Sequence, residues 1–165
     1  MGEPPGGSLL RTSLTLDTEA LTFLRQLING KALWALLFYL VRTGHLKDAL
    51  LVAIESEAAL NRHEELFTTF LKSWVESADR RCGDPRFYSQ FTSHLFSSSL
   101  PTNLRDRLLA NYNSHILHAP NVDPFKLALF KLIGRIDPHR RQVPMAIQNT
   151  EDWIWFQLAM VCVEH

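Results

Sequence analysis

The last apolar segment of the chain constrains its fold more than any other sequence feature. From Trp153 to Val163 the only polar residue is Gln157, so a helix formed here would be apolar on every side rather than along one stripe. Such a helix is stable in water only when other elements pack around it. The segment therefore predicts a stack of helices, and we expect the chain to be a slice of a longer stack.

This final helix has a clear predicted beginning. Asn149 is a favourable N-cap residue, and Asp152 follows at the spacing of a capping box. Glu151 adds a second carboxylate to the first turn, where the helix dipole favours negative charge. Because no nucleophile or metal ligand lies near them in the sequence, we interpret Glu151 and Asp152 as structural residues rather than as a general acid and base.

Length and composition limit the classes of function. The 165 residues suffice for one domain, and the 17 basic and 17 acidic residues leave no excess positive charge for binding nucleic acid. Cys82 and Cys162 fit no zinc or redox spacing, which favours a reducing compartment. The longest apolar run, residues 32–41, is about half the length of a membrane-spanning helix, so no direct membrane insertion is expected.

Helical spacing of apolar residues recurs through most of the chain, and no stretch alternates like a strand. The sequence predicts an all-α fold of roughly eight helices joined by short loops. We expect a flexible lead-in at residues 1–13 and a single, partial α-helical solenoid domain at residues 14–165. The helices are expected to begin or end at these signals: Asp17 and the turn Asn29-Gly30; Leu33 and Gly44; Leu46; the capping-box pair Asn61 and Glu64; Asp84-Pro85; Pro101 and Thr102; Asp123-Pro124; and Asn149.

The segment from Trp34 to Ala59 predicts a tight helical hairpin. Ala49 and Ala53 are small enough to let the backbones of its two helices come close. The hairpin is similar to a tetratricopeptide unit in its Trp, its turn glycine Gly44 and its Ala positions, but no fixed period returns along the chain. An irregular α-solenoid is therefore predicted.

The sequence contains no motif that predicts catalysis. His115 and His118 could share a helix face, but no third metal ligand lies at a supporting interval. Gly-rich phosphate loops and Gly-x-Ser-x-Gly elbows are absent from the sequence, and no cysteine has an evident activating histidine. We expect neither an enzyme nor a cofactor.

Three separated segments of the sequence resemble one family. The first contains Trp34, Ala35, Tyr39, Arg42 and Gly44; the second contains Asp123, Pro124, Gly134, Arg135 and Asp137; the third contains Glu151, Asp152, Trp153 and Trp155. In the identity, order and separation of these residues the chain is similar to the nucleoporin interacting component proteins, the large helical scaffold subunits of the inner ring of the nuclear pore. The similarity runs from about Asn29 to the C-terminus.

The resemblance implies a structural scaffold at the nuclear envelope, within the nuclear pore complex, that supports pore assembly and nucleocytoplasmic transport of protein and RNA. It also implies other scaffold and linker nucleoporins as partners, with no nucleic acid, small-molecule substrate or cofactor. Proteins of the family are several times longer than this chain, so the resemblance implies a central slice of the solenoid and maps no partner to particular residues here.

The sequence leaves one alternative function open, a helical-repeat adaptor of the tetratricopeptide or vesicle-coat kind. Polar, basic residues that recur on the inner helix of each repeat are typical of a peptide-binding array. The second and seventh predicted helices are mostly apolar instead, which favours the scaffold.

Overall fold

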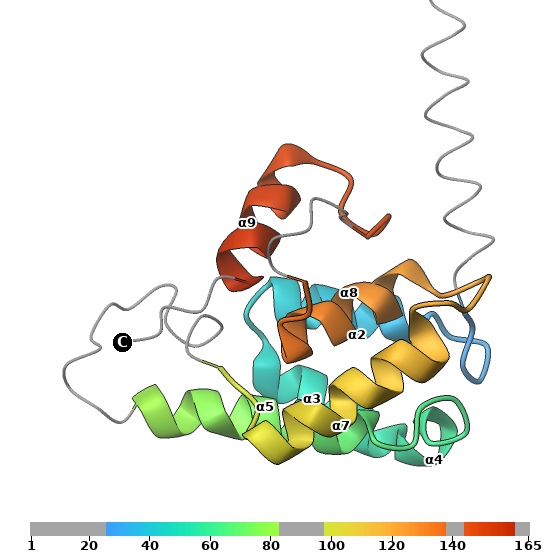
Figure 1. Ribbon diagram of the computed structural model, residues 1–165, viewed down its shortest axis with the longest axis horizontal. Helices are drawn as coiled ribbons and strands as arrows, with labels where there is room; N and C mark the ends of the chain where they lie inside the picture. The colour runs from blue at the N-terminus through green and yellow to red at the C-terminus, as the bar shows by residue number, and fades with distance from the viewer. Residues whose placement is uncertain (1–25, 83–97, 138–143, 161–165) are drawn as a thin grey trace, which may run out of the picture.

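The computed structural model describes residues 26–82, 98–137 and 144–160, and this part of the chain is helical (Figure 1). Its elements are α2 (Leu33–Arg42), α3 (Leu46–Glu55), α4 (Glu57–Leu60), α5 (Phe67–Cys82), α7 (Thr102–Asn111), the π-helical turn η2 (Tyr112–Ile116), α8 (Pro124–Gly134) and α9 (Thr150–Met160). No strand occurs within these ranges, where one isolated bridge pairs Ile28 with Lys31. The predicted all-α fold class is confirmed.

The end of α2 has the predicted glycine cap. Gly44 has a φ of +83°, a conformation that glycine adopts without strain because it has no Cβ. The N–H of His45 donates to the carbonyl of Leu40 at 2.8 Å, and the N–H of Gly44 donates to the carbonyl of Val41 at 3.1 Å. These two bonds form a Schellman motif, so the chain leaves α2 in a defined direction.

The beginnings of α8 and α9 also follow the sequence signals. Asp123 precedes Pro124 and accepts hydrogen bonds from the backbone N–H of Phe125 at 2.8 Å and of Lys126 at 3.3 Å. At α9, Asn149 Oδ1 accepts the N–H of Asp152 at 2.7 Å. Asp152 completes this cap by accepting from the Asn149 side-chain amide at 2.8 Å, in place of the backbone N–H of a standard capping box.

The predicted hairpin is formed by α2 and α3, and α3 also packs on α5. Ala49 and Ala53 have no exposed surface, as expected where two helix backbones approach closely. Leu46, Ala49, Leu50, Ala53 and Ile54 recur at helical spacing, which predicts that they share one face, yet Ile54 is 46% exposed. The buried face of α3 is therefore narrower than the apolar pattern predicts.

The helix surrounded on nearly every side is α8. It packs against α2, α5, α7 and α9, and Figure 1 shows α2 and α8 between α9 on one side and α5 and α7 on the other. All residues of α8 except Lys126 and Leu127 are buried. In α9, by contrast, Trp153, Ile154 and Leu158 are 47%, 47% and 56% exposed, so the apolar surface of the last helix is only partly covered within the described structure.

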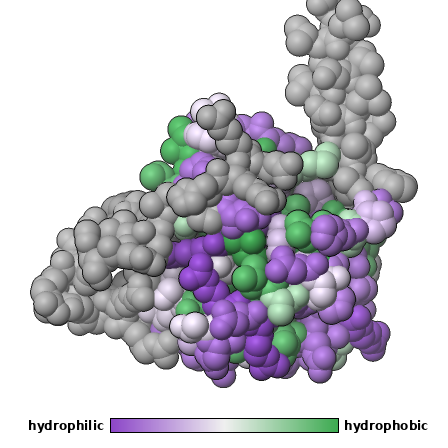
Figure 2. Space-filling model, viewed as in Figure 1, coloured by the Kyte–Doolittle hydropathy of each residue, from purple (hydrophilic) through white to green (hydrophobic). Residues whose placement is uncertain are grey.

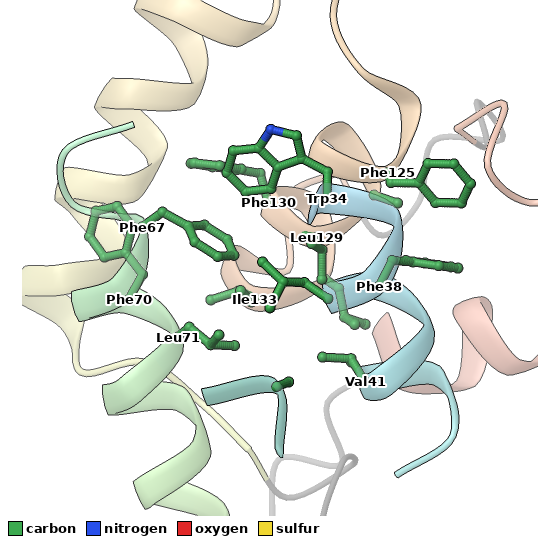
Figure 3. Packing of buried hydrophobic residues seen from close by; sticks show 14 of the residues in the cluster. Trp34, Phe38, Val41, Phe67, Phe70, Leu71, Phe125, Leu129, Phe130 and Ile133 are labelled. Carbon is green, nitrogen blue, oxygen red and sulfur yellow. The ribbon is translucent and has the colours of Figure 1, made fainter. Parts of the chain in front are cut away.

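Aromatic rings from separate helices build the core (Figure 3). Trp34 of α2 makes an edge contact with Phe67 of α5, with the ring centroids 4.8 Å apart. Phe67 in turn lies 5.7 Å from Phe130 of α8. Edge and tilted contacts suit the charge distribution of aromatic rings, and Leu129 and Ile133 of α8 lie beside them. The core therefore joins helices that are distant in the sequence.

The expected helix end at Asn29-Gly30 is wrong. Asn29 and Gly30 have φ values of +51° and +72°, and positive φ at both central residues is the pattern of a type I′ turn. The turn closes a short hairpin in which Ile28 and Lys31 exchange backbone hydrogen bonds of 2.9 and 3.1 Å. Asn-Gly is therefore a turn, as predicted, but the described residues just before it, 26–28, are not helical.

The expected capping box at Asn61 and Glu64 is also wrong. The helix α4 ends at Leu60, and α5 begins only at Phe67. The Glu64 carboxylate does not cap a helix but is buried in an ion pair with Lys126 of α8. The helices predicted at Asp17 and at Asp84-Pro85, the lead-in at residues 1–13 and the chain beyond Met160 lie outside the described residues.

Candidate functional site

The three segments that carry the family resemblance meet at one place in the fold. They form α2, α8 and α9, and one ring from each helix takes part. Phe38 of α2 lies 5.5 Å from Phe125 of α8 and 5.9 Å from Trp155 of α9, measured between ring centroids. We call these residues, together with Arg42 and Asp152, the three-helix junction. Segments up to 110 residues apart thus contact one another directly.

An ion pair joins two of the helices at the junction. Arg42 Nε donates to Asp152 Oδ1 at 2.8 Å, and the guanidinium carbon lies 4.9 Å from the centre of the Trp155 ring. Arg42 is in the last turn of α2 and Asp152 is in the first turn of α9. Each charge therefore has the sign that its own helix dipole favours, while the planar guanidinium stacks on an aromatic face.

Other predicted motif residues of these helices lie outside the junction. Trp34 is buried against Phe67 of α5, and Ala35 is also buried. Tyr39 and Trp153 are about half exposed, at 51% and 47%. The Tyr39 ring rests 5.6 Å from that of Phe125. Glu151 is exposed in the first turn of α9, where its charge favours the helix beginning.

The predicted residues at the two ends of α8 have local structural roles. Asp123 caps the first turn, and Pro124 occupies its first position. At the other end, Arg135 and Asp137 have φ values of +48° and +52°, and Arg135 Nη2 donates to the carbonyl of Ser98 at 2.6 Å. Arg135 thus supplies the left-handed cap and ties the end of α8 to the chain leading into α7.

Gly134 is needed for packing rather than for its backbone angle. A Cβ built on it would clash with Leu108 Cδ2 of α7 and would lie 3.1 Å from Ile136 Cγ1. Leu108 is 1% exposed, so its side chain has little room to move. The absence of a side chain at this position lets α7 approach α8 closely.

A buried ion cluster was missed by the sequence reasoning. Glu64 pairs with Lys126 of α8 and also accepts a hydrogen bond from Asn111 Nδ2 at 3.0 Å. The Lys126 ammonium lies 5.6 Å from the centre of the Trp34 ring. The cluster joins the loop before α5 to α2, α7 and α8. A buried charge needs such partners, yet no local sequence spacing marks a pair this far apart.

Within the described ranges no cluster of three or more His, Cys, Asp or Glu side chains is suited to hold a metal ion. His115 forms hydrogen bonds through Nδ1 with Asn111 Oδ1 at 2.8 Å and Ser114 Oγ at 3.0 Å. None of the described helices is long and apolar enough to cross a bilayer.

The predicted motif residues cap helices, pack between them or join them by an ion pair. These are the contacts of a structural protein built from stacked helices. The sequence profile of the Nup93/Nic96 family matches residues 10–165. The chain belongs to the Nup93/Nic96 family of structural nucleoporins, so the resemblance predicted from the three segments is confirmed.

Individual relatives agree with this assignment. Nucleoporin NIC96 of Saccharomyces cerevisiae is 35% identical over 134 residues, which are 81% of this chain and 14% of the yeast protein. Nucleoporin NIC96 of Chaetomium thermophilum is 31% identical over 134 residues, 80% of this chain and 10% of the relative. Nuclear pore complex protein Nup93 of Xenopus laevis is 26% identical over 137 residues, which are 83% of this chain and 14% of the Xenopus protein. The chain therefore spans a small part of these relatives, all components of the nuclear pore.

Proposed function

We propose that this chain forms part of the structural scaffold of the inner ring of the nuclear pore complex at the nuclear envelope. In this function it acts through contacts with other scaffold and linker nucleoporins, and it supports pore assembly and nucleocytoplasmic transport of protein and RNA. It uses no cofactor and catalyses no reaction. Residues 14–165 belong to one partial solenoid domain.

The observation that carries this proposal is the three-helix junction. The residues of the family segments are placed where they hold α2, α8 and α9 together, by the Arg42–Asp152 ion pair and by the rings of Phe38, Phe125 and Trp155. Such contacts fix the angles at which the three helices pack, and the angles between packed helices set the path of a solenoid. A part of a large scaffold needs this property because its shape positions its partners.

A replacement experiment in yeast tests the proposed function. The segment of NIC96 that matches this chain is replaced by this chain, and the fluorescent chimera is expressed from the NIC96 locus. We expect fluorescence at the nuclear rim and co-purification of other pore proteins. A chimera of equal abundance that is diffuse through the cell would contradict the proposal. A matched chimera carrying Trp34→Ala, which removes a core side chain, is the control for loss of folding.

A further inference from the structure

The outer side of α3 carries an exposed apolar patch. Leu51 and Ile54 are 57% and 46% exposed, and residues three apart lie on the same side of a helix. The helix packs on α2 and α5 through a different side, on which Leu46, Ala49 and Ala53 are buried. The patch therefore lies on the side of α3 that is turned away from these two helices.

Two charged residues lie in line with Leu51 on this side of the helix. Lys47 precedes Leu51 by four residues and Glu55 follows it by four, and both are exposed. Residues four apart are neighbours on a helix surface, so the three side chains form one row. The two charges are about 12 Å apart along the helix axis, beyond the spacing at which charges pair within a helix. The row is therefore basic at one end, apolar in the middle and acidic at the other.

Each charge of this row is at the end of α3 that disfavours it. Lys47 is the second residue of the helix and Glu55 is the last, whereas the helix dipole favours negative charge at the N-terminus and positive charge at the C-terminus. Glu55 makes no ion pair with another described residue, and Glu57 adds a second exposed carboxylate just beyond it. The last turn of α3 contains no basic residue, so a cation from outside the helix would be stabilised there.

A second copy of the same helix, placed antiparallel, complements this row along its whole length. With Leu51 at a two-fold axis, Lys47 of each copy lies against Glu55 of the other, and the two Leu51 side chains pack together. Packing of rows of residues four apart is the commonest arrangement of two helices, and the symmetry forms each contact twice. Each charge then also lies beside the helix end that favours it. We infer that α3 is a surface through which two copies of this chain associate.

The inferred dimer is weak and reversible. One helix face is smaller than the roughly 800 Å² per partner that a stable complex buries. Ile54 extends the apolar centre on one flank of Leu51, and the exposed Asp48 forms a polar edge on the other flank. This association goes beyond the scaffold function proposed above, because it joins copies of this chain rather than this chain and other nucleoporins.

Charge exchange in the full chain tests the inferred pairing. Lys47→Glu makes both ends of the row acidic and Glu55→Lys makes both ends basic, so a dimer of either variant places like charges together. Sedimentation velocity from about 10 µM to about 1 mM protein covers the range of a weak dimer. We expect each single variant to weaken the dimer at least about tenfold. An equimolar mixture of the two variants, or the double variant Lys47→Glu/Glu55→Lys, should restore it.

Recovery in the mixture supports the inference, because it requires the two charges to meet across the dimer. A wild-type chain that stays monomeric over this range overturns the inference, as do single variants that dimerise like the wild type or a mixture that does not recover. Lysine and glutamate have similar helix propensities, and circular dichroism checks that the variants keep their helicity. Leu51→Glu should also abolish the dimer. Leu109→Glu, at a 42% exposed position of α7, is the matched control and should leave it unchanged.

Crosslinking tests the position of the two-fold axis. In a background with Cys82→Ser and Cys162→Ser, Leu51→Cys is compared with Leu109→Cys under mild oxidation. We expect Leu51→Cys to form the disulfide between two copies at least about tenfold faster, because a residue at the axis meets its own copy and the bond requires Cα atoms within about 7 Å. Equal rates for the two variants, followed on non-reducing gels, would overturn the inferred arrangement.

Discussion

Trp34 connects more parts of the core than its position in one helix indicates. Its ring contacts Phe67 of α5, and its Nε1 donates to Gln26. We expect Trp34→Ala to lower the free energy of unfolding by about 3–5 kcal/mol, because it leaves a cavity between packed helices. Urea unfolding followed by circular dichroism measures this loss. Trp153→Ala, at a half-exposed position, is the control and is expected to cost less than about 1 kcal/mol.

Gly134 marks a second position where one residue limits the packing of two helices. We expect Gly134→Ala to destabilise the fold by about 1 kcal/mol, because overpacking against Leu108 costs about 1–3 kcal/mol and exceeds the gain in helix propensity of up to about 1 kcal/mol. Thermal unfolding measures the change. Adding Leu108→Val, which shortens the side chain that the new Cβ meets, should recover part of the lost stability. A stabilising effect of Gly134→Ala alone would contradict the close approach of α7 and α8 at this position.

The residues predicted best from the sequence are those with local partners. Gly44 and Asp123 were predicted as caps because a helix end needs a particular backbone angle or acceptor within a few residues, and both have these roles in the structure. Glu64 was assigned to a local capping box, but its carboxylate pairs with Lys126 instead. A contact between distant residues leaves no spacing signal in the sequence. The sequence therefore did not indicate that Lys126 would compete with the local helix end for the Glu64 carboxylate.

Between elements, the Glu64–Lys126 pair joins the loop before α5 to α8. Both side chains are mostly buried, so removing one charge leaves the other unpaired in a poorly solvated site. We expect Lys126→Met to lower the free energy of unfolding by about 3–5 kcal/mol. The double variant Glu64→Leu/Lys126→Met should be more stable than Lys126→Met alone, as urea unfolding would show. Equal losses in the single and double variants would mean that the charge pair itself is unimportant.

The Arg42–Asp152 pair has the corresponding role between α2 and α9, but it is only partly buried. Arg42→Met is therefore expected to lower the free energy of unfolding by about 1 kcal/mol or less. We also expect it to increase the rate of amide hydrogen exchange in α9 more than in α5, which is remote from the pair. Mass spectrometry of peptic fragments measures both. Arg42→Lys should give an intermediate rate, because lysine keeps the charge but loses the Nε donor and the planar stack on Trp155. Unchanged exchange in α9 would show that other contacts hold the helix.

Helix positions were predicted well wherever apolar periodicity extended over several turns, as in α2, α5 and α8. Their ends were predicted less well near Ile28 and Glu64, where tertiary contacts override the local signals. The π-helical turn after α7, in which the N–H of Leu117 donates to the carbonyl of Tyr112 at 2.8 Å, was also missed. Tyr112 and Ile116 at its two ends are both buried.

For the molecule as a whole, the uneven burial of α8 and α9 determines where apolar surface remains. Figure 2 shows hydrophobic residues at the surface over α9. We expect Ile154→Glu/Leu158→Glu to reduce light scattering of the concentrated chain without loss of helicity, since both side chains are about half exposed and exposed apolar patches promote association. The charge-matched control is Asn103→Glu/Thr102→Glu at exposed positions of α7. Loss of helicity in the α9 variant would place these residues inside the core.

The family could be predicted from the sequence as a whole because its characteristic residues are spread over three segments that fold against one another. Each segment alone consists of common helix signals, and their combination corresponds to the joint packing of α2, α8 and α9. The sequence predicted that the last helix needs neighbours on all sides, yet the described helix with this property is α8. Composition alone does not distinguish the two, because both are rich in apolar residues and only the path of the chain decides which lies in the middle.

The hydrogen bond from Gln26 to Asp123 also has a consequence during protein synthesis. Its two residues are 97 positions apart, and ribosomes add about 5–20 residues per second. The start of the fold must therefore wait on the order of 5–20 seconds for its partner to be made. During that interval the Trp34 side of α2 lacks α8, so the emerging chain exposes its central aromatic surface until translation has passed α8.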